Sequence, residues 1–534
     1  MPVRHAFKSL SLQHLKKLFR LSLEADRKKT NDITALSEEQ HYHAINRRKL
    51  LVDTAKVAAL VGVSGLYNAC APANNKTQPT IAIVGAGIAG LHAAYILKQA
   101  GYKSYVYEGS GRIGGRIMSV TDMLGPGLWT EMGGEFIDST HTEMLNLCKH
   151  FNLPLLDRLE PSEKHLEEFA YFFNGQHYHE KDVIAALHPY AAQIKKDIDS
   201  LSETITYKSS SAIDKKFDNM SIMEYLDSIG VQGWLRSMIY NSYTAEYGME
   251  ATEQSAISFL AVFDIGNEEH YNIYGDSNER YSVIGGNLKL CEALANEMQD
   301  YVLPNHFLTA IQQRNDKSYQ LYFKITGSGS IGVTADIVIL TVPFTVLREV
   351  DIQVLMPAWK MNTIKNLGYG SNSKMFFGLN ERVWRKHGYA GYAFGDNGMM
   401  NGYDNTQMQN NNVGPGGYTI FPGGNAGVAV GDTDPLILKE KYITALDGVY
   451  PGAKAAFNNN FQFWCWPTYG YSKGSYVSFK VNQYTTMSGS EFEPVDNIYF
   501  AGEHCSYAFQ GFMNGGAETG RMAAEMIIKK LKGK

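Results

Sequence analysis

The sequence predicts an α/β protein in which a doubly wound parallel sheet is interleaved with a second, α+β domain. Residues 81–99 read as a short apolar strand, a glycine-rich turn and a helix, and residues 105–108 as a second strand ending in an acid. Two more buried apolar strands follow far along the chain, at 336–341 and 497–501. A chain of 534 residues with 44% hydrophobic side chains is large enough for two such domains.

The first predicted strand leads into a turn with the pattern G-x-G-x-x-G, formed by Gly85, Gly87 and Gly90. The first glycine permits a tight turn, the second lets a pyrophosphate approach the backbone, and the third lets the helix pack on the strand. Ile88 and Ala89 open the helix, so their N–H groups face the phosphates. This turn predicts a Rossmann-like dinucleotide-binding site.

The second predicted strand, 105–107, ends at Glu108, which stands 18 residues after Gly90. A carboxylate at this point accepts hydrogen bonds from the hydroxyls of an adenosine ribose. A strand, a glycine turn, a helix and a terminal acid in this order predict a dinucleotide-binding site much more specifically than the glycine spacing alone.

Composition excludes several classes of protein. The formal charge is −5, and a mild negative charge does not suggest a nucleic-acid-binding protein, which needs a basic surface. The five cysteines are far apart and show no metal-ligand spacing, so neither a metal site nor a disulfide scaffold is predicted.

Several further motifs occur in a fixed order along the chain. They are Gly111–Arg116, Glu131–Ile137, Ala335–Pro343, Ala501–His504 and Gly511–Gly520. In these motifs and their order, from about residue 78 to the end, the sequence resembles the flavin-containing amine oxidases, the family of monoamine, polyamine and L-amino-acid oxidases. The resemblance implies the amine-oxidase fold, an FAD cofactor and a homodimer. Ser475 stands where some family members have a flavin-linking cysteine, so we expect FAD to be bound non-covalently.

The resemblance also implies which residues contact the cofactor. Beyond the residues of the first unit these are Arg112, Gly115, Arg116, Gly133, Gly134, Glu135, Phe136, Leu308, Glu503, Phe512 and Met513. Glu503 would hold the ribityl or phosphate region, and the Met513 amide, at a helix start, would face the flavin ring.

The resemblance implies a catalytic lysine as well. Lys374, in the segment Leu367–Met375, matches the family lysine that acts through a water beside the flavin. Tyr476 and Phe512 would form the two walls of an aromatic cage, with Trp466 in the segment leading to Tyr476 and Gly511 offering a carbonyl to the substrate amine.

The substrate depends on whether the site binds a carboxylate. Venom-type L-amino-acid oxidases have an arginine where this sequence has Phe136, which favours a plain amine. The helix start at Asn514–Gly516 and the N-terminal leader instead resemble those of bacterial secreted L-amino-acid oxidases, and Tyr418 is a candidate carboxylate contact. We expect an L-amino-acid oxidase that forms a 2-oxo acid, ammonia and hydrogen peroxide with O2. The alternatives are a monoamine or polyamine oxidase and a non-catalytic FAD-binding protein.

The motif positions predict the domain organisation. The FAD domain is expected from 78–150, 275–350 and 466–534, and the substrate domain from 151–274 and 351–465.

Residues 1–77 form a leader or extension in this interpretation. Arg47-Arg48, a modest apolar run and Ala71-Pro72-Ala73 resemble a twin-arginine export signal. A periplasmic or secreted location follows from that signal, and a cytoplasmic one if the segment is an ordinary helix pair. No transmembrane span is expected.

Overall fold

The computed structural model describes residues 78–533 except 160, 164, 263–277 and 299–300, so the leader lies outside the described residues. Five parallel strands form the central sheet in the order β20-β13-β1-β2-β9. Their bounds are β1 Ile81–Val84, β2 Ser104–Tyr107, β9 Val302–Leu303, β13 Ile337–Leu340 and β20 Ile498–Phe500. The scattered apolar runs of the sequence thus meet in one sheet, as predicted.

Both faces of this sheet are buried, which explains why its strands are continuously apolar. Ile81 and Ile83 of β1 face a helical layer, whereas Ala82 and Val84 face the opposite side. The helical layer contains α3 (Ile88–Gln99), α4 (Thr142–His150), α10 (Leu288–Asn296) and α17 (Met513–Leu531). On the other side lies a four-stranded sheet of β10 (His306–Gln313), β11 (Tyr319–Ile325), β12 (Gly329–Ala335) and β14 (Asp351–Gln353).

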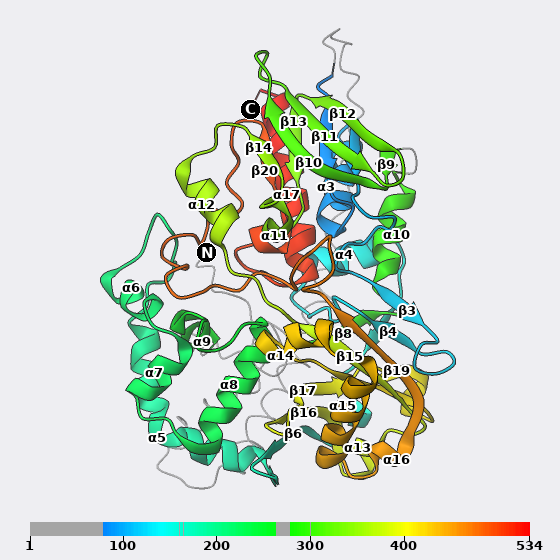
Figure 1. Ribbon diagram of the computed structural model, residues 1–534, viewed down its shortest axis with the longest axis vertical. Coiled ribbons are helices and arrows are strands. Elements are labelled where there is room, and N and C mark those ends of the chain that lie inside the picture. Colours follow the sequence, from blue (N-terminus) through cyan, green and yellow to red (C-terminus); the bar gives the residue numbers. More distant parts are fainter. Residues whose placement is uncertain (1–77, 160, 164, 263–277, 299–300, 534) are drawn as a thin grey trace, which may run out of the picture.

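A seven-stranded sheet lies at the lower right of the molecule in Figure 1. Its order is β19-β15-β18-β17-β16-β6-β7, with β6 Glu167–Phe173, β7 Gln176–Tyr178, β15 Ser373–Leu379, β16 Tyr389–Gly395, β17 Met400–Asp404, β18 Gly416–Ile420 and β19 Phe457–Cys465. Short ribbons pair β3 (Ser119–Thr121) with β4 (Trp129–Glu131) and β5 (Leu155–Asp157) with β8 (Tyr281–Val283).

Helices surround this second sheet. One group is α5 (Glu180–Asp199), α6 (Ala212–Asp218), α7 (Ile222–Ser228), α8 (Gly233–Tyr247) and α9 (Ala256–Val262), which lie at the lower left in Figure 1. The others beside this sheet are α13 (Val383–Lys386), α14 (Gly424–Ala429), α15 (Pro435–Val449) and α16 (Ala453–Ala456). Two further helices, α11 (Phe344–Leu347) and α12 (Ala358–Asn366), lie in the upper half of the molecule in Figure 1. Among the described residues no helix has the length and apolar character needed to cross a membrane.

One buried carboxyl makes the stability of this fold depend on pH. Glu491 is 2% exposed, and the nearby Lys360 Nζ donates to its main-chain oxygen at 2.9 Å. Burial raises the pKa of the Glu491 carboxyl to about 8. The folded chain therefore keeps this group protonated while the unfolded chain ionises it, so its stabilising contribution is present at pH 4 and is lost as the pH rises to 8.

We expect the substitution Glu491→Gln to remove this loss. The free energy of unfolding of the variant should exceed that of the parent at pH 8, by up to about 4 kcal/mol, and by little at pH 4. Denaturant unfolding at the two pH values measures the difference. Glu381→Gln is the matched control, because Glu381 is exposed and paired with Lys386. An equal difference at both pH values would contradict the protonation of Glu491.

Candidate active site

A single long cavity connects the carboxyl end of β1 with the seven-stranded sheet. Of the predicted residues it is lined by Gly85, Gly87, Ile88, Ala89, Glu108, Gly115, Arg116, Gly133, Gly134, Glu135, Phe136, Leu308, Lys374, Trp466, Tyr476, Glu503, Gly511, Phe512 and Met513. Gly90, Arg112 and Tyr418 are not among its lining residues. The cavity therefore brings together most of the residues that the motifs selected.

The glycine turn has the geometry of a phosphate cradle. Gly85 has φ +109°, a conformation that favours glycine, and a Cβ on Gly90 would lie 2.0 Å from the Gly85 oxygen. A Cβ on Gly87 would meet nothing within 3.8 Å and would occupy the cavity itself. Gly90 thus acts by letting α3 approach the turn, and Gly87 by leaving room for a ligand.

Two helices begin at the cavity without a capping side chain. Ile88 opens α3 and Met513 opens α17, and neither first turn contains an acidic residue. Their first amides and the positive ends of both helix dipoles are therefore available to an anionic or electron-rich ligand.

Glu108 is held in place by the turn it follows. Its carboxylate accepts hydrogen bonds from the Ala86 N–H at 2.8 Å, the Ser110 N–H at 2.8 Å and the Ser110 hydroxyl at 2.7 Å. Because a carboxylate can accept about four hydrogen bonds, it keeps capacity for a ribose hydroxyl.

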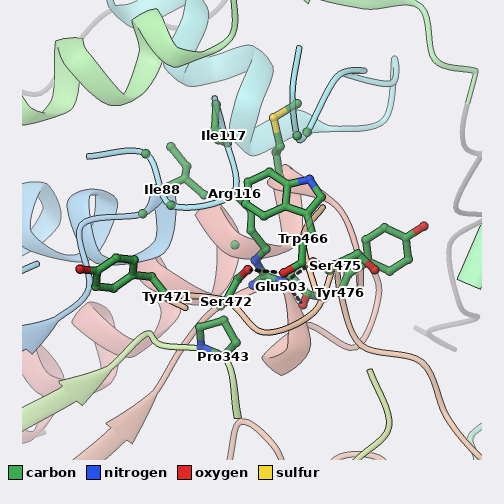
Figure 2. Close-up of a pocket in the computed structure, with 18 of the residues that line it drawn as sticks. Ile88, Arg116, Ile117, Pro343, Trp466, Tyr471, Ser472, Ser475, Tyr476 and Glu503 are labelled. Atoms are coloured by element: carbon green, nitrogen blue, oxygen red, sulfur yellow. Dashed lines mark hydrogen bonds and ion pairs between the residues drawn. The ribbon is translucent and has the colours of Figure 1, made fainter. Parts of the chain in front are cut away.

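An ion pair lies beside this cradle, where Figure 2 shows Arg116 and Glu503 meeting. Arg116 Nη1 stands 2.7 Å from Glu503 Oε1 and also donates to the Ser475 oxygen at 2.8 Å. The second carboxylate oxygen of Glu503 accepts from the Gly511 N–H at 2.8 Å. Glu503 therefore ties three cavity segments together.

Arg112 supports the cradle from outside the cavity. Its guanidinium donates to the Gly115 oxygen at 2.6 Å and to the Ile113 oxygen at 3.2 Å, and it lies over the Tyr469 ring. Its contacts are those of a residue that holds the turn.

At the other end of the cavity lies an aromatic chamber built around a buried lysine. Lys374 of β15 is 4% exposed, and its Nζ donates to the Glu135 carboxylate at 2.8 Å and to the oxygens of Gly133 at 2.8 Å and Glu131 at 3.0 Å. The Tyr403 hydroxyl donates to the same Glu135 oxygen at 2.7 Å. These contacts account for all three ammonium hydrogens, and Lys374 and Tyr403 together hold the Glu135 side chain in a fixed position.

Burial, together with the Glu135 carboxylate, raises the pKa of Tyr403 well above its usual value. Tyr403 therefore stays a hydrogen-bond donor. Trp466 and Tyr476 are also anchored: the indole N–H of Trp466 donates to the Met132 oxygen at 3.0 Å, and the Tyr476 hydroxyl donates to the Glu246 oxygen.

The structure places Tyr418 away from the chamber, which corrects its selection as a carboxylate contact. It is fully buried in a core cluster, with its ring 5.1 Å from that of Trp384. In the sheet Tyr418 pairs with Phe377 of β15, and both lie on the face opposite to Lys374.

Several chamber residues carry no sequence motif. They are Glu246, Glu279, Tyr392, Asn401, Tyr403 and Phe421. They come from α8, from the segment before β8, and from strands β16 and β17 and the residue after β18. In the described part of the chain no group of three or more His, Cys, Asp or Glu side chains is placed to hold a metal ion.

The fold and this cavity define a class of protein. A dinucleotide cradle at the end of a parallel sheet, opening into a buried aromatic chamber, is the arrangement of an oxidoreductase that brings a dinucleotide to a small substrate.

Comparison with known proteins gives the family. The model of the flavin containing amine oxidoreductases matches residues 88–528, so the chain belongs to this family. Its cofactor is FAD, for which the open cradle at Gly87 and the uncapped helix starts are suited. The predicted family and fold are confirmed.

Several named relatives share between 18% and 24% of their residues with this chain. The "Probable flavin-containing monoamine oxidase A" of Dictyostelium discoideum is 24% identical, over 84% of this chain and 98% of its own. The L-amino-acid oxidase of Echis ocellatus is 23% identical, over 84% of this chain and 88% of its own length. Among solved structures, putrescine oxidase bound to putrescine has a TM-score of 0.72 at 21% identity, over 85% and 99%. Cyclohexylamine oxidase from Brevibacterium oxydans has a TM-score of 0.72 at 18% identity, over 85% and 100%.

Proposed function

We propose that this flavin-dependent amine oxidoreductase is an oxidase that removes two electrons from the carbon–nitrogen bond of a primary amine and passes them to O2, forming hydrogen peroxide. The observation that carries the proposal is the continuity of the FAD cradle with a chamber containing Lys374, Glu135 and Tyr403. FAD, when bound, supplies the two-electron acceptor.

The residues of the chain bind and orient the amine. The rings of Trp466, Tyr476 and Phe512 exclude water and contact the apolar part of the substrate. The Glu135 carboxylate, fixed by Lys374 and Tyr403, provides negative charge near the amine, and the Gly511 carbonyl is a candidate acceptor for its N–H. Lys374 is the candidate catalytic residue, as the family resemblance implies, and its ammonium holds the Glu135 side chain at 2.8 Å.

The charge of the chamber favours a substrate with a second positive group. Glu246 and Glu279 line it in addition to Glu135, whereas the two cations of the cavity lining, Lys374 and Arg116, are each paired with a carboxylate. A carboxylate pair attracts an ammonium group and disfavours an isolated anion. Putrescine, the ligand in one structure of similar fold, has two ammonium groups.

An L-amino acid, oxidised to a 2-oxo acid and ammonia, is the second candidate. L-amino-acid oxidases are among the relatives, and a buried arginine, Arg158, lies directly behind Phe136. A homodimer and an exported location, expected from resemblance, remain predictions.

The proposed function can be tested by anaerobic mixing of the purified FAD-loaded protein with cadaverine and with pentylamine. These compounds differ only in the distal ammonium group. We expect both to bleach the visible flavin band, with a kcat/KM for cadaverine greater by on the order of 10-fold or more. Glu246→Gln should reduce this preference, whereas Glu253→Gln, at an exposed glutamate paired with Lys480, should not. An FAD-loaded protein bleached by no amine and no amino acid would contradict oxidase function.

A further inference from the structure

Met513 brings a thioether to the wall of the cavity. It is the first residue of α17, it is buried, and it lines the cavity together with Gly134. The two residues are in close contact, because a Cβ on Gly134 would lie 2.7 Å from the Met513 Cγ and 2.9 Å from its sulfur. The sulfur therefore packs against the main chain of a cavity segment whose neighbouring residues, Gly133 and Glu135, accept hydrogen bonds from Lys374.

Among the described residues that line the cavity, Met513 supplies the only sulfur. The four cysteines in the described part of the chain, Cys148, Cys291, Cys465 and Cys505, are buried and lie outside this lining. Burial raises the pKa of the Cys148 thiol to about 11, that of Cys291 to about 12 and that of Cys505 well above its usual value. Because peroxide attacks the thiolate, these three protonated thiols are poor targets for it.

A thioether, in contrast, reacts with peroxide without first losing a proton. The oxidant is the hydrogen peroxide that the proposed amine oxidation forms inside the cavity. This peroxide contacts the lining of the cavity before it reaches solvent, so its first sulfur is that of Met513.

We propose that Met513 is a self-modification site, which the hydrogen peroxide made by the enzyme oxidises to methionine sulfoxide. This inference goes beyond the proposed function and rests on it, since amine oxidation supplies the peroxide. The sulfur lone pair attacks one peroxide oxygen, a sulfur–oxygen bond forms and the oxygen–oxygen bond breaks. The second oxygen leaves with both peroxide hydrogens as water, and the two electrons lost by sulfur are those gained by peroxide.

The sulfoxide changes the cavity at the start of α17. Contact with Gly134 leaves no room for an oxygen on that side of the sulfur, so the added oxygen takes up space in the cavity. This oxygen is also an acceptor for the first amides of α17, which have no capping side chain. Both effects compete with the cofactor, so we expect the oxidised protein to lose FAD and activity as turnovers accumulate.

Turnover in the presence of excess catalase tests the proposal, because catalase removes peroxide from solvent but not from the cavity. The FAD-loaded protein is supplied in air with cadaverine, pentylamine or L-leucine, whichever reduces the flavin fastest, and sulfoxides are located by mass spectrometry. Met526, an exposed residue of the same helix, reports peroxide in solvent. After subtraction of a sample kept in air without substrate, we expect sulfoxide at Met513 to exceed that at Met526 by on the order of 10-fold or more.

Met513→Leu removes the sulfur and keeps a side chain of similar size. With catalase present, the loss of activity during turnover, relative to the initial rate of the same variant, should slow by at least about 5-fold. Its flavin content after gel filtration should stay constant during turnover, whereas that of the wild type should fall. Met487→Leu is the matched control, because Met487 is buried but lies outside the cavity lining, and this variant should lose activity and FAD as the wild type does.

The failures are distinguishable. An unmodified Met513 in a protein that has formed a large excess of peroxide would overturn the self-modification and leave the amine oxidase proposal standing. Sulfoxide that catalase abolishes at Met513 and Met526 alike would overturn it as well, because the oxidant would then be peroxide in solvent. Absence of peroxide with every amine and amino acid would overturn the proposed function, and the self-modification with it.

Discussion

Substitution of Lys374 by methionine is expected to slow reduction of the flavin by substrate by about 1000-fold while FAD remains bound. Methionine fills a similar volume but donates no hydrogen bond, so the Glu135 carboxylate loses its ammonium partner at 2.8 Å. An unpaired buried carboxylate takes up a proton, and the chamber then loses the fixed negative charge that positions the amine. Stopped-flow measurement of the anaerobic half-reaction and of reoxidation by O2 locates the affected step.

Lys360→Met is the matched control for this experiment. Lys360 is also a buried lysine, and its Nζ donates to the main-chain oxygens of Ser490 at 2.6 Å and Glu491 at 2.9 Å, outside the cavity lining. We expect Lys360→Met to lower the melting temperature without changing either half-reaction. Unchanged rates of both half-reactions in Lys374→Met would exclude a catalytic role for this lysine.

Gly90→Ala is expected to produce a protein that does not retain FAD. The added Cβ would lie 2.0 Å from the Gly85 oxygen, and that contact is with backbone, so α3 and the turn must separate. The amides of Ile88 and Ala89 then no longer converge on the cofactor phosphates. The absorbance ratio of the visible flavin band to the protein band, measured after gel filtration, should fall by at least about 10-fold.

Gly470→Ala controls for the loss of a glycine as such. A Cβ at Gly470 would meet nothing within 4 Å, and no left-handed backbone conformation is required there. This variant should elute with the flavin content of the parent. Full retention of FAD by Gly90→Ala would show that the turn tolerates displacement and that the cofactor is held mainly by the contacts around Glu503.

The sequence was most informative about the cofactor cradle because its determinants are local. Gly85, Gly90 and Glu108 act through backbone conformation and short spacing, and a parallel strand buried on both faces is recognisable as an apolar run. Even the distant segments around Arg116 and Glu503 carried family motifs. The structure brings these segments together around one cavity, and their roles in FAD binding stay predictions.

The chamber was less predictable because tertiary contacts assemble it. Tyr403 and Glu279 became site residues through the pairing of β17 and the placement of the chain before β8, and neither stands in a motif. Tyr418 was selected from a promising aromatic segment, but strand register decides which face a side chain occupies. Its pairing with Phe377 turned it toward α15 and the core.

The position of β20 and α17 has a consequence for biosynthesis. The cradle that begins at Gly85 is completed by Glu503 and Met513, and β20 joins the parallel sheet through β13. A ribosome must therefore translate residues 85–513 before all the segments that line this cavity exist. The complete cavity is therefore available to FAD only after synthesis has passed the start of α17, so we expect FAD binding to follow the folding of both domains.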